Sequence, residues 1–229
     1  MAILLVILLH TVYRCAKEIE PITIGTLIPR NNARLFSIDR VEPAIEIAVE
    51  KVRTELKLIT DRNISIHFAD SKCNVADGMN EAINFFVRRE IDVFFGPCCD
   101  YAAAPVARQI RYWNIAMVTP GAMARDFATK KKSMFNLTTR VGSNINSIVN
   151  MLLSLLQKFS WHKVNLLYDP EGQNHILEKF CHITADGIHF GLKDAKLEQR
   201  YFKFETIDMI LSTIVENIGK EYASKCSFL

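Results

Sequence analysis

The 229-residue sequence lacks the short motifs that mark the common families of enzyme active sites. It has no GxxxxGK[ST] phosphate-binding loop, no GxSxG nucleophile turn and no HExxH zinc-binding helix. The dinucleotide fingerprint GxGxxG is also missing, because Gly25 stands alone in the first apolar segment after the N-terminal region. None of the paired cysteine spacings of zinc sites is present. We therefore expect a protein that is not an enzyme and that holds no metal.

Neither sign of charge dominates the sequence. The 28 Lys and Arg residues nearly balance the 25 Asp and Glu residues, which leaves a net charge of +3. Nucleic-acid-binding domains usually concentrate basic charge, and the longest basic run here, Lys130–Lys132, is short, so no nucleic acid partner is expected. The composition, 49% hydrophobic and 23% charged, is typical of a folded globular chain of one or two domains.

Long apolar runs are also missing, since no stretch after the N-terminus reaches the 18 residues of a membrane-spanning helix. A shorter apolar run at 2–9 fits the core of a secretory signal peptide, which we assign to residues 1–16. No Lys or Arg precedes this run, and a buried first strand is the alternative interpretation. The N-x-S/T triplets at Asn63 and Asn136 support secretion and predict glycosylation at both asparagines.

Strand-like and helix-like apolar patterns alternate along the chain. The patterns predict strands at 22–28, 64–69, 91–95, 115–118 and 164–168, and helices at 41–58, 76–89, 101–113, 144–159, 176–183 and 207–218. Asp39 is the expected N-cap of the first helix, with Pro43 in its first turn. This alternation predicts an α/β fold with a doubly wound parallel sheet. The long interval before 164–168 marks the passage between two lobes, at 17–160 and 161–229.

Three of the six cysteines follow predicted strands: Cys73 follows the second strand, and Cys98 and Cys99 follow the third. Loops at the carboxyl ends of neighbouring parallel strands lie close together, at the edge where ligands bind. A disulfide between Cys73 and one of the other two is therefore feasible, and a ring of about 26 residues stabilises a fold by roughly 3–4 kcal/mol. Three reduced thiols and a metal site are the alternatives, although no fourth metal ligand lies nearby.

The most specific segment is FGPCCDYAAAPVAR, from Phe95 to Arg108. Together with Trp113 and the Pro-Gly-Ala at 120–122, it closely resembles the extracellular ligand-binding domain of the natriuretic peptide receptors. These are membrane guanylate cyclase receptors and shorter clearance-type receptors. Further matches on both sides of this segment occur in the same order as in the family, at Asp70–Cys73, Leu137–Arg140, Trp161, Leu166–Tyr168, Cys181 and Asp186–His189. The resemblance implies a type I periplasmic-binding-protein fold, with two doubly wound lobes, a cleft and a hinge.

The resemblance also implies how the cysteines pair. Cys73 would pair with Cys99, and Cys181 would pair with Cys226, which is the one later cysteine. Cys98 stands where the family usually has another residue, often Gly or Val, so it is expected to be a free thiol or an alternative partner.

Two sets of binding residues follow from the family. Some members hold a chloride ion at positions that correspond to Ser71, Cys98 and Cys99, although the neighbouring carboxylate of Asp100 would oppose an anion there. Peptide contacts in the family correspond to Tyr101 and Arg108. The alternative for this second set is structural, with the tyrosine covering the core beneath its loop and the arginine solvated.

The function implied is that of an extracellular ligand-binding region of a hormone receptor, which binds a peptide and transmits or clears its signal. Such a region is secreted or lies outside the plasma membrane, and dimerisation through the ectodomain is a further expectation. Family receptors continue through a complete second lobe and a transmembrane helix, so this shorter chain is expected to have an incomplete second lobe and to meet the membrane only through a missing C-terminal segment. It could be a truncated, non-signalling form.

An alternative is a receptor domain of the same fold for an amino-acid-like molecule. Such sites usually clasp a carboxylate at a helix start, which the carboxylate of Asp100 would repel.

Overall fold

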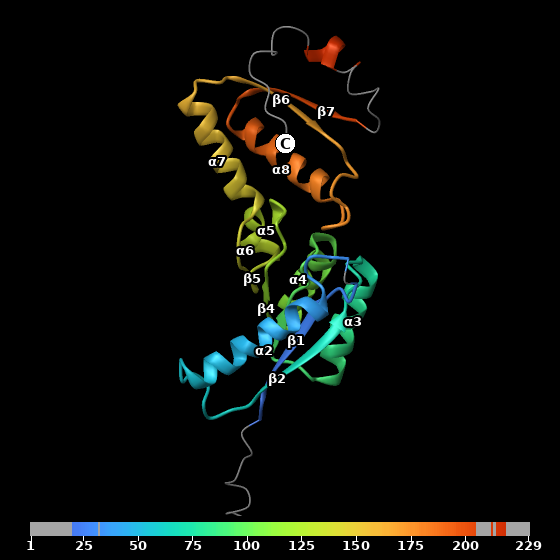
Figure 1. Cartoon of the computed structure of the whole chain (residues 1–229), viewed down its shortest axis with the longest axis vertical. Helices are drawn as coiled ribbons and strands as arrows, with labels where there is room; N and C mark the ends of the chain where they lie inside the picture. The colour runs from blue at the N-terminus through green and yellow to red at the C-terminus, as the bar shows by residue number, and fades with distance from the viewer. Residues whose placement is uncertain (1–19, 32, 205–211, 213, 219–229) are drawn as a thin grey trace, which may run out of the picture.

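The computed structural model describes residues 20–31, 33–204, 212 and 214–218 (Figure 1). Strands and helices alternate along this part of the chain and build two parallel sheets. The predicted α/β fold with parallel strands is therefore confirmed. The predicted signal peptide at 1–16 and half of the predicted helix at 207–218 lie outside the described residues. Within that predicted helix, the structure describes a short π-helix, η1 (Ile214–Ile218).

The larger sheet has five parallel strands in the order β2-β1-β3-β4-β5. Its strands are β1 (Ile22–Ile28), β2 (Ile64–Asp70), β3 (Val93–Phe95), β4 (Ala116–Thr119) and β5 (Thr138–Arg140). The helices between them are α2 (Ile38–Thr54), α3 (Val75–Arg88), α4 (Asp100–Trp113), α5 (Asp126–Thr129) and α6 (Lys131–Met134). Strand β5 was not predicted, because its three residues, Thr-Thr-Arg, show no apolar alternation.

The core of this lobe lies between the sheet and helices α3 and α4. Phe94 of β3 and Met117 of β4 are fully buried against Val106 and Ile110 of α4. The Phe85 ring of α3 packs edge-on against Phe94, with ring centroids 6.3 Å apart. Because helices bury the sheet, the sequences of its central strands are almost continuous hydrophobic runs.

The first helix starts earlier than predicted. Its N-cap is Ser37 rather than Asp39, so Asp39 lies in the first turn, where a carboxylate still favours the helix dipole. Pro43 consequently lies inside α2 instead of in its first turn. The helix tolerates this proline at the loss of one backbone hydrogen bond, since proline has no N–H.

The smaller sheet pairs β6 (Lys163–Tyr168) with β7 (Glu198–Lys203), in parallel and in register from Lys163 with Glu198. Helices α7 (Ile145–Lys158) and α8 (Phe180–Asp194) pack against each other beside this sheet (Figure 1). Ile145 and Val149 of α7 share a core cluster with Leu166 of β6. Because α7 packs with the second sheet, we propose that the lobes divide between Arg140 and Ile145, and not at residue 160.

Helix α8 differs most from its prediction, which placed a helix at 176–183. The observed helix starts at Phe180 and continues to Asp194, through Gly187 and Gly191. Both glycines lie against α7, where a β-carbon would come within 2.3 Å of the side chain of Ile145 and 2.2 Å of that of Val149. The glycines lower helix propensity but permit close helix packing, so local sequence patterns end the helix too early.

Candidate functional site

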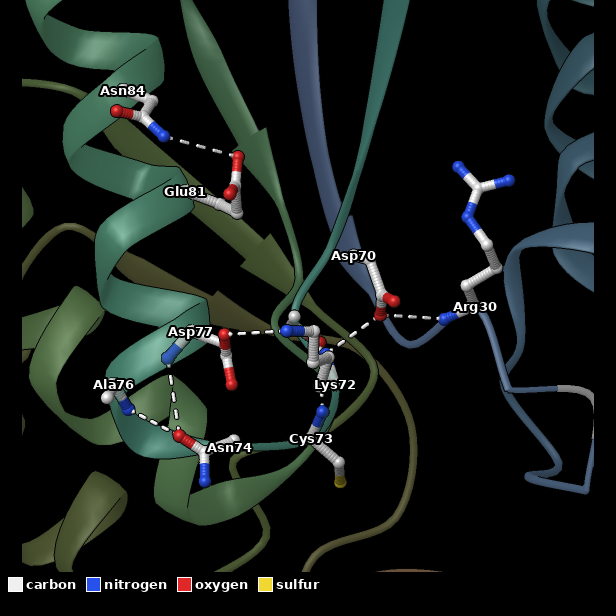
Figure 2. A network of polar contacts seen from close by, with 10 residues as sticks. Arg30, Asp70, Lys72, Cys73, Asn74, Ala76, Asp77, Glu81 and Asn84 are labelled. Carbon is white, nitrogen blue, oxygen red and sulfur yellow. Dashed lines mark hydrogen bonds and ion pairs between the residues drawn. The ribbon is translucent and has the colours of Figure 1, made fainter.

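The loops at the carboxyl end of the larger sheet are joined by backbone and side-chain hydrogen bonds. Figure 2 shows Asp70, at the end of β2, whose Oδ1 atom accepts from the backbone N–H of Arg30 at 2.9 Å and of Lys72 at 2.8 Å. Asn74 caps α3 by accepting from the N–H groups of Ala76 and Asp77. These contacts fix the loop after β2 relative to the loop after β1.

A disulfide joins the loop after β2 to the loop after β3. It links Cys73 with Cys99, whose Cα atoms are 5.4 Å apart, and both residues are buried. The structure therefore agrees with the pairing implied by the family and leaves Cys98 as a buried free thiol. For the second implied pair, Cys181 is half-buried and Cys226 lies outside the described residues, so that pair stays a prediction.

The loop after β4 packs tightly against the Gly-Pro-Cys-Cys loop that follows β3. Thr119 donates a hydrogen bond from its hydroxyl to the carbonyl of Pro97 at 2.6 Å, and its oxygen accepts from the N–H of Gly121 at 3.0 Å. A β-carbon at Gly121 would lie only 1.8 Å from the carbonyl oxygen of Cys98. The two loops thus approach so closely that only glycine fits at position 121.

Asp100, the first residue of α4, ties that helix to the loop after β4. Its side chain is 8% exposed and accepts a hydrogen bond from the N–H of Ala124 at 2.7 Å. Burial raises the pKa of this carboxyl, although backbone N–H groups and the nearby Arg140 act in the opposite direction. Arg140 donates to the carbonyl of Ala122 at 3.1 Å. A protein carboxylate thus sits at the start of α4.

The raised pKa of Asp100 predicts a pH-dependent effect of Asp100→Asn. The carboxyl of Asp100 keeps its proton to a higher pH in the folded state than in the unfolded state. The protonated form therefore stabilises the wild-type fold at low pH, and this contribution is lost as the pH rises through the folded pKa. The free energy of unfolding of the variant should therefore rise relative to wild type as the pH increases above the ordinary pKa of an aspartate, about 4. Urea titrations across this range measure the difference, and a constant or falling difference would contradict the prediction.

The implied chloride-binding residues gather around the disulfide. Ser71, Cys98 and Cys99 are all buried, and the hydroxyl oxygen of Ser71 accepts a weak hydrogen bond from the N–H of Cys73 at 3.4 Å. The three positions are therefore brought together, while their use as an anion site remains a prediction.

A cleft of about 610 Å³ separates α4 from α8. Both residues implied to contact a peptide line it from the same side of α4, with Tyr101 and Arg108 two turns apart. Tyr101 is 36% exposed, so it is not a fully buried core residue, and the ammonium of Lys179 lies 5.9 Å from its ring. The guanidinium carbon of Arg108 lies 5.7 Å from the ring of Phe135.

The facing wall of the cleft was missed by sequence reasoning. It includes Asp186 and Phe190 from the unpredicted part of α8, and Asp194 at its end. Arg125, which precedes α5, forms an ion pair with Asp194 and lies 6.0 Å from the ring of Phe190. A predicted helix that continued to Asp194 would have placed Asp186, Phe190 and Asp194 on one element and so indicated this wall.

No group of metal-binding side chains occurs within the described residues. The same part of the chain contains no helix that is long and apolar enough to cross a membrane.

The fold of the chain has a counterpart among solved proteins. A solved ABC transporter substrate-binding protein from Desulfitobacterium hafniense matches with a TM-score of 0.65 at 16% identity, over 87% of this chain and 56% of that chain. The predicted type I periplasmic-binding-protein-like fold is thereby confirmed. The family model described as "Receptor family ligand binding region" matches residues 40–193, and the chain belongs to this family.

Named receptors are among its relatives. Atrial natriuretic peptide receptor 3 from Homo sapiens is 32% identical over 87% of this chain and 37% of its own length, and the Rattus norvegicus receptor 3 is 33% identical over 90% and 39%. Atrial natriuretic peptide receptor 2 from Anguilla japonica is 28% identical over 65% of this chain and 15% of its own length. The resemblance inferred from the sequence is confirmed, and the chain spans less than two fifths of the length of these relatives.

Proposed function

We propose that this chain is an extracellular, non-enzymatic ligand-binding region that binds a peptide hormone for a natriuretic-peptide-receptor-like protein. The observation that carries the proposal is the cleft between α4 and α8, into which the Asp-Tyr-Ala-Ala-Ala-Pro-Val-Ala-Arg segment presents Tyr101 and Arg108. Secretion through the signal peptide at 1–16 and glycans on the exposed Asn63 and Asn136 belong to the same proposal.

The cleft offers the contacts that a peptide needs. Tyr101 supplies apolar area and a hydroxyl, and Arg108 supplies a planar set of donors for backbone carbonyls or a carboxylate. Phe190 adds an apolar surface on the facing helix, and the exposed Asp186 adds a negative charge that suits a basic side chain.

The direct test is binding of atrial natriuretic peptide, the hormone named in the relatives, to the secreted chain by isothermal titration calorimetry. We expect Tyr101→Ala and Arg108→Ala each to raise the dissociation constant about tenfold or more, as for a contact worth 1–2 kcal/mol. Arg111→Ala is the matched control, because Arg111 lies on the same helix outside the cleft lining. Unchanged affinity in both cleft variants, or no peptide binding, would overturn this assignment.

The same titration also tests the alternative of a small-molecule receptor. Tight binding of free amino acids, unaffected by Tyr101→Ala, would favour the small-molecule receptor instead of the peptide receptor.

We further propose that the three buried residues Ser71, Cys98 and Cys99 hold a chloride ion. Replacing chloride by gluconate in the titration tests this site, and peptide affinity should fall if the ion supports the loop.

We also propose that the region forms a homodimer through the outer surface of α3 and α4. Val87 is 70% exposed and Tyr112 is 74% exposed, which are high values for large apolar side chains. They adjoin Phe86 and Trp113, whose rings stack with centroids 4.5 Å apart. A symmetric pairing of two copies would bury this apolar patch.

A charge placed in the patch should dissociate the dimer. We expect Val87→Asp to raise the dimer dissociation constant at least about tenfold in sedimentation velocity experiments, because a carboxylate would lose its hydration in the interface. Val141→Asp is the control, since Val141 is 57% exposed and lies beyond β5. A wild-type chain that stays monomeric at tens of micromolar would exclude this interface.

A further inference from the structure

Three sulfur atoms gather at the carboxyl edge of the larger sheet. Cys73 and Cys99 form the disulfide, and the Sγ atom of Cys98 lies 3.9 Å from that of Cys99. All three residues are buried, with Cys98 only 1% exposed. The free thiol of Cys98 therefore contacts the disulfide at Cys99, and attack on Cys73 requires a loop movement that brings the Cys98 sulfur opposite the bond to Cys99.

We propose that Cys98 is a second bonding partner for Cys73, so that the bridge exchanges between Cys73–Cys99 and Cys73–Cys98. Cys98 gives its proton to solvent, and its thiolate attacks the Sγ atom of Cys73. The Cys73–Cys99 bond breaks, and the electron pair leaves with the sulfur of Cys99, which then takes up a proton. One S–S bond and one thiol are present before and after the step, so no oxidant or reductant is consumed.

Geometry favours the Cys73–Cys98 bond over a bond between the adjacent cysteines. Neighbouring Cα atoms are about 3.8 Å apart, below the usual range of about 4.4–6.8 Å for a disulfide. The Cys73 sulfur, by contrast, needs to shift by no more than about the 3.9 Å that separates the two alternative sulfur atoms. Lys72 and Cys73 both hold left-handed φ angles, of 47° and 57°, which most residues avoid, so a change of backbone conformation at these two residues would relieve local strain.

Local electrostatics set the rate of the exchange. Burial raises the pKa of Cys98 to about 12, which keeps the thiol protonated and makes the exchange slow at neutral pH. Cys99 is the N-cap of α4, and a helix N-terminus stabilises a thiolate, which favours Cys99 as the leaving group. Any loop opening that hydrates Cys98 accelerates the step.

The exchange matters for the proposed binding site because of where each bridge is anchored. The present bridge holds the N-cap of α4, two residues before Tyr101, whereas the alternative holds the preceding loop residue. The alternative bridge therefore frees the start of α4 and the orientation of Tyr101 towards the cleft. This consequence rests on the proposed function, whereas the exchange itself does not.

The first experiment is a disulfide map of Cys99→Ser, secreted into oxidising medium and digested without reduction after thiol alkylation. We expect a Cys73–Cys98 peptide in this variant, and a Cys73–Cys99 peptide in the matched variant Cys98→Ser. The Cys99→Ser chain should also melt well above the Cys98→Ser/Cys99→Ser double variant, which has no bridge in this loop. Alkylation of both Cys73 and Cys98 in Cys99→Ser would overturn the proposal.

The second experiment uses the wild-type chain and does not depend on folding of a variant. Incubation between pH 7 and pH 10, followed by acid quenching and alkylation, should label Cys99 and yield the Cys73–Cys98 peptide. The rate should rise about tenfold per pH unit, as the thiolate fraction does below a pKa of about 12. In the matched variant Cys98→Ser, Cys99 should stay unlabelled.

Absence of the Cys73–Cys98 peptide at every pH, or equal labelling of Cys99 in Cys98→Ser, would contradict the exchange. Peptide binding is not used in either experiment, so failure of the proposed function leaves both readouts intact.

Discussion

Replacing Cys73 by serine is expected to lower the free energy of unfolding by about 3.5 kcal/mol, the loop-closure entropy of a ring spanning 26 residues. The bridge restricts the unfolded chain, in which the loops after β2 and β3 would otherwise separate freely. In the folded state the loss is not compensated, because Cys73 is buried and a serine hydroxyl there would lose its contact with water. Urea unfolding followed by circular dichroism measures the change.

Cys73 is the informative position because it takes part in both proposed bridges. Cys99→Ser should cost less, since Cys98 can replace the lost partner. Cys98→Ser is the matched control, because it changes a buried sulfur without removing a bridge and should cost only about 1 kcal/mol. Equal losses in Cys73→Ser and Cys98→Ser would show that the bridge contributes nothing beyond the packing of its sulfur atoms.

The sequence was sufficient to predict those parts of the fold that depend on local apolar periodicity. Strand β1 is predicted with its observed bounds, and α4 differs from its prediction by one residue at its start. Elements that depend on distant partners were missed. Strand β7 reads Glu-Gln-Arg-Tyr-Phe-Lys, and its charged residues hide a strand that exists because it pairs with β6. Helix α8 continues past Gly187, where a β-carbon would come within 2.3 Å of the side chain of Ile145 of α7, so this part of the helix depends on a packing partner that is distant in sequence.

The same distinction applies to the candidate site. One wall of the cleft lies in the continuous segment that carries the family resemblance, and that resemblance implied Tyr101 and Arg108 as contact residues. The other wall combines Arg125, which precedes α5, with Asp194 at the far end of α8. No local pattern relates two residues that are 69 positions apart, and their ion pair follows from the way the lobes pack.

Gly121→Ala is expected to destabilise the chain by about 3 kcal/mol or more, beyond the usual cost of adding a methyl group to a core. The new β-carbon would lie 1.8 Å from the carbonyl oxygen of Cys98 and 2.5 Å from its carbonyl carbon. These are backbone atoms, so no side-chain rotation can relieve the overlap. The loop after β4 would have to move away from the loop that carries the disulfide.

The movement would be transmitted to the start of α4. Asp100 accepts its hydrogen bond from Ala124 in the displaced loop, so a shift there would break the contact that holds the helix start. Gly142→Ala is the matched control, because nothing lies within 4 Å of its added β-carbon and only its φ angle of +104° opposes the change. We expect a loss of about 1 kcal/mol for that control, measured by the same urea titration. If Gly121→Ala were no more destabilising than Gly142→Ala, the close approach of the two loops would not be a feature of the folded protein.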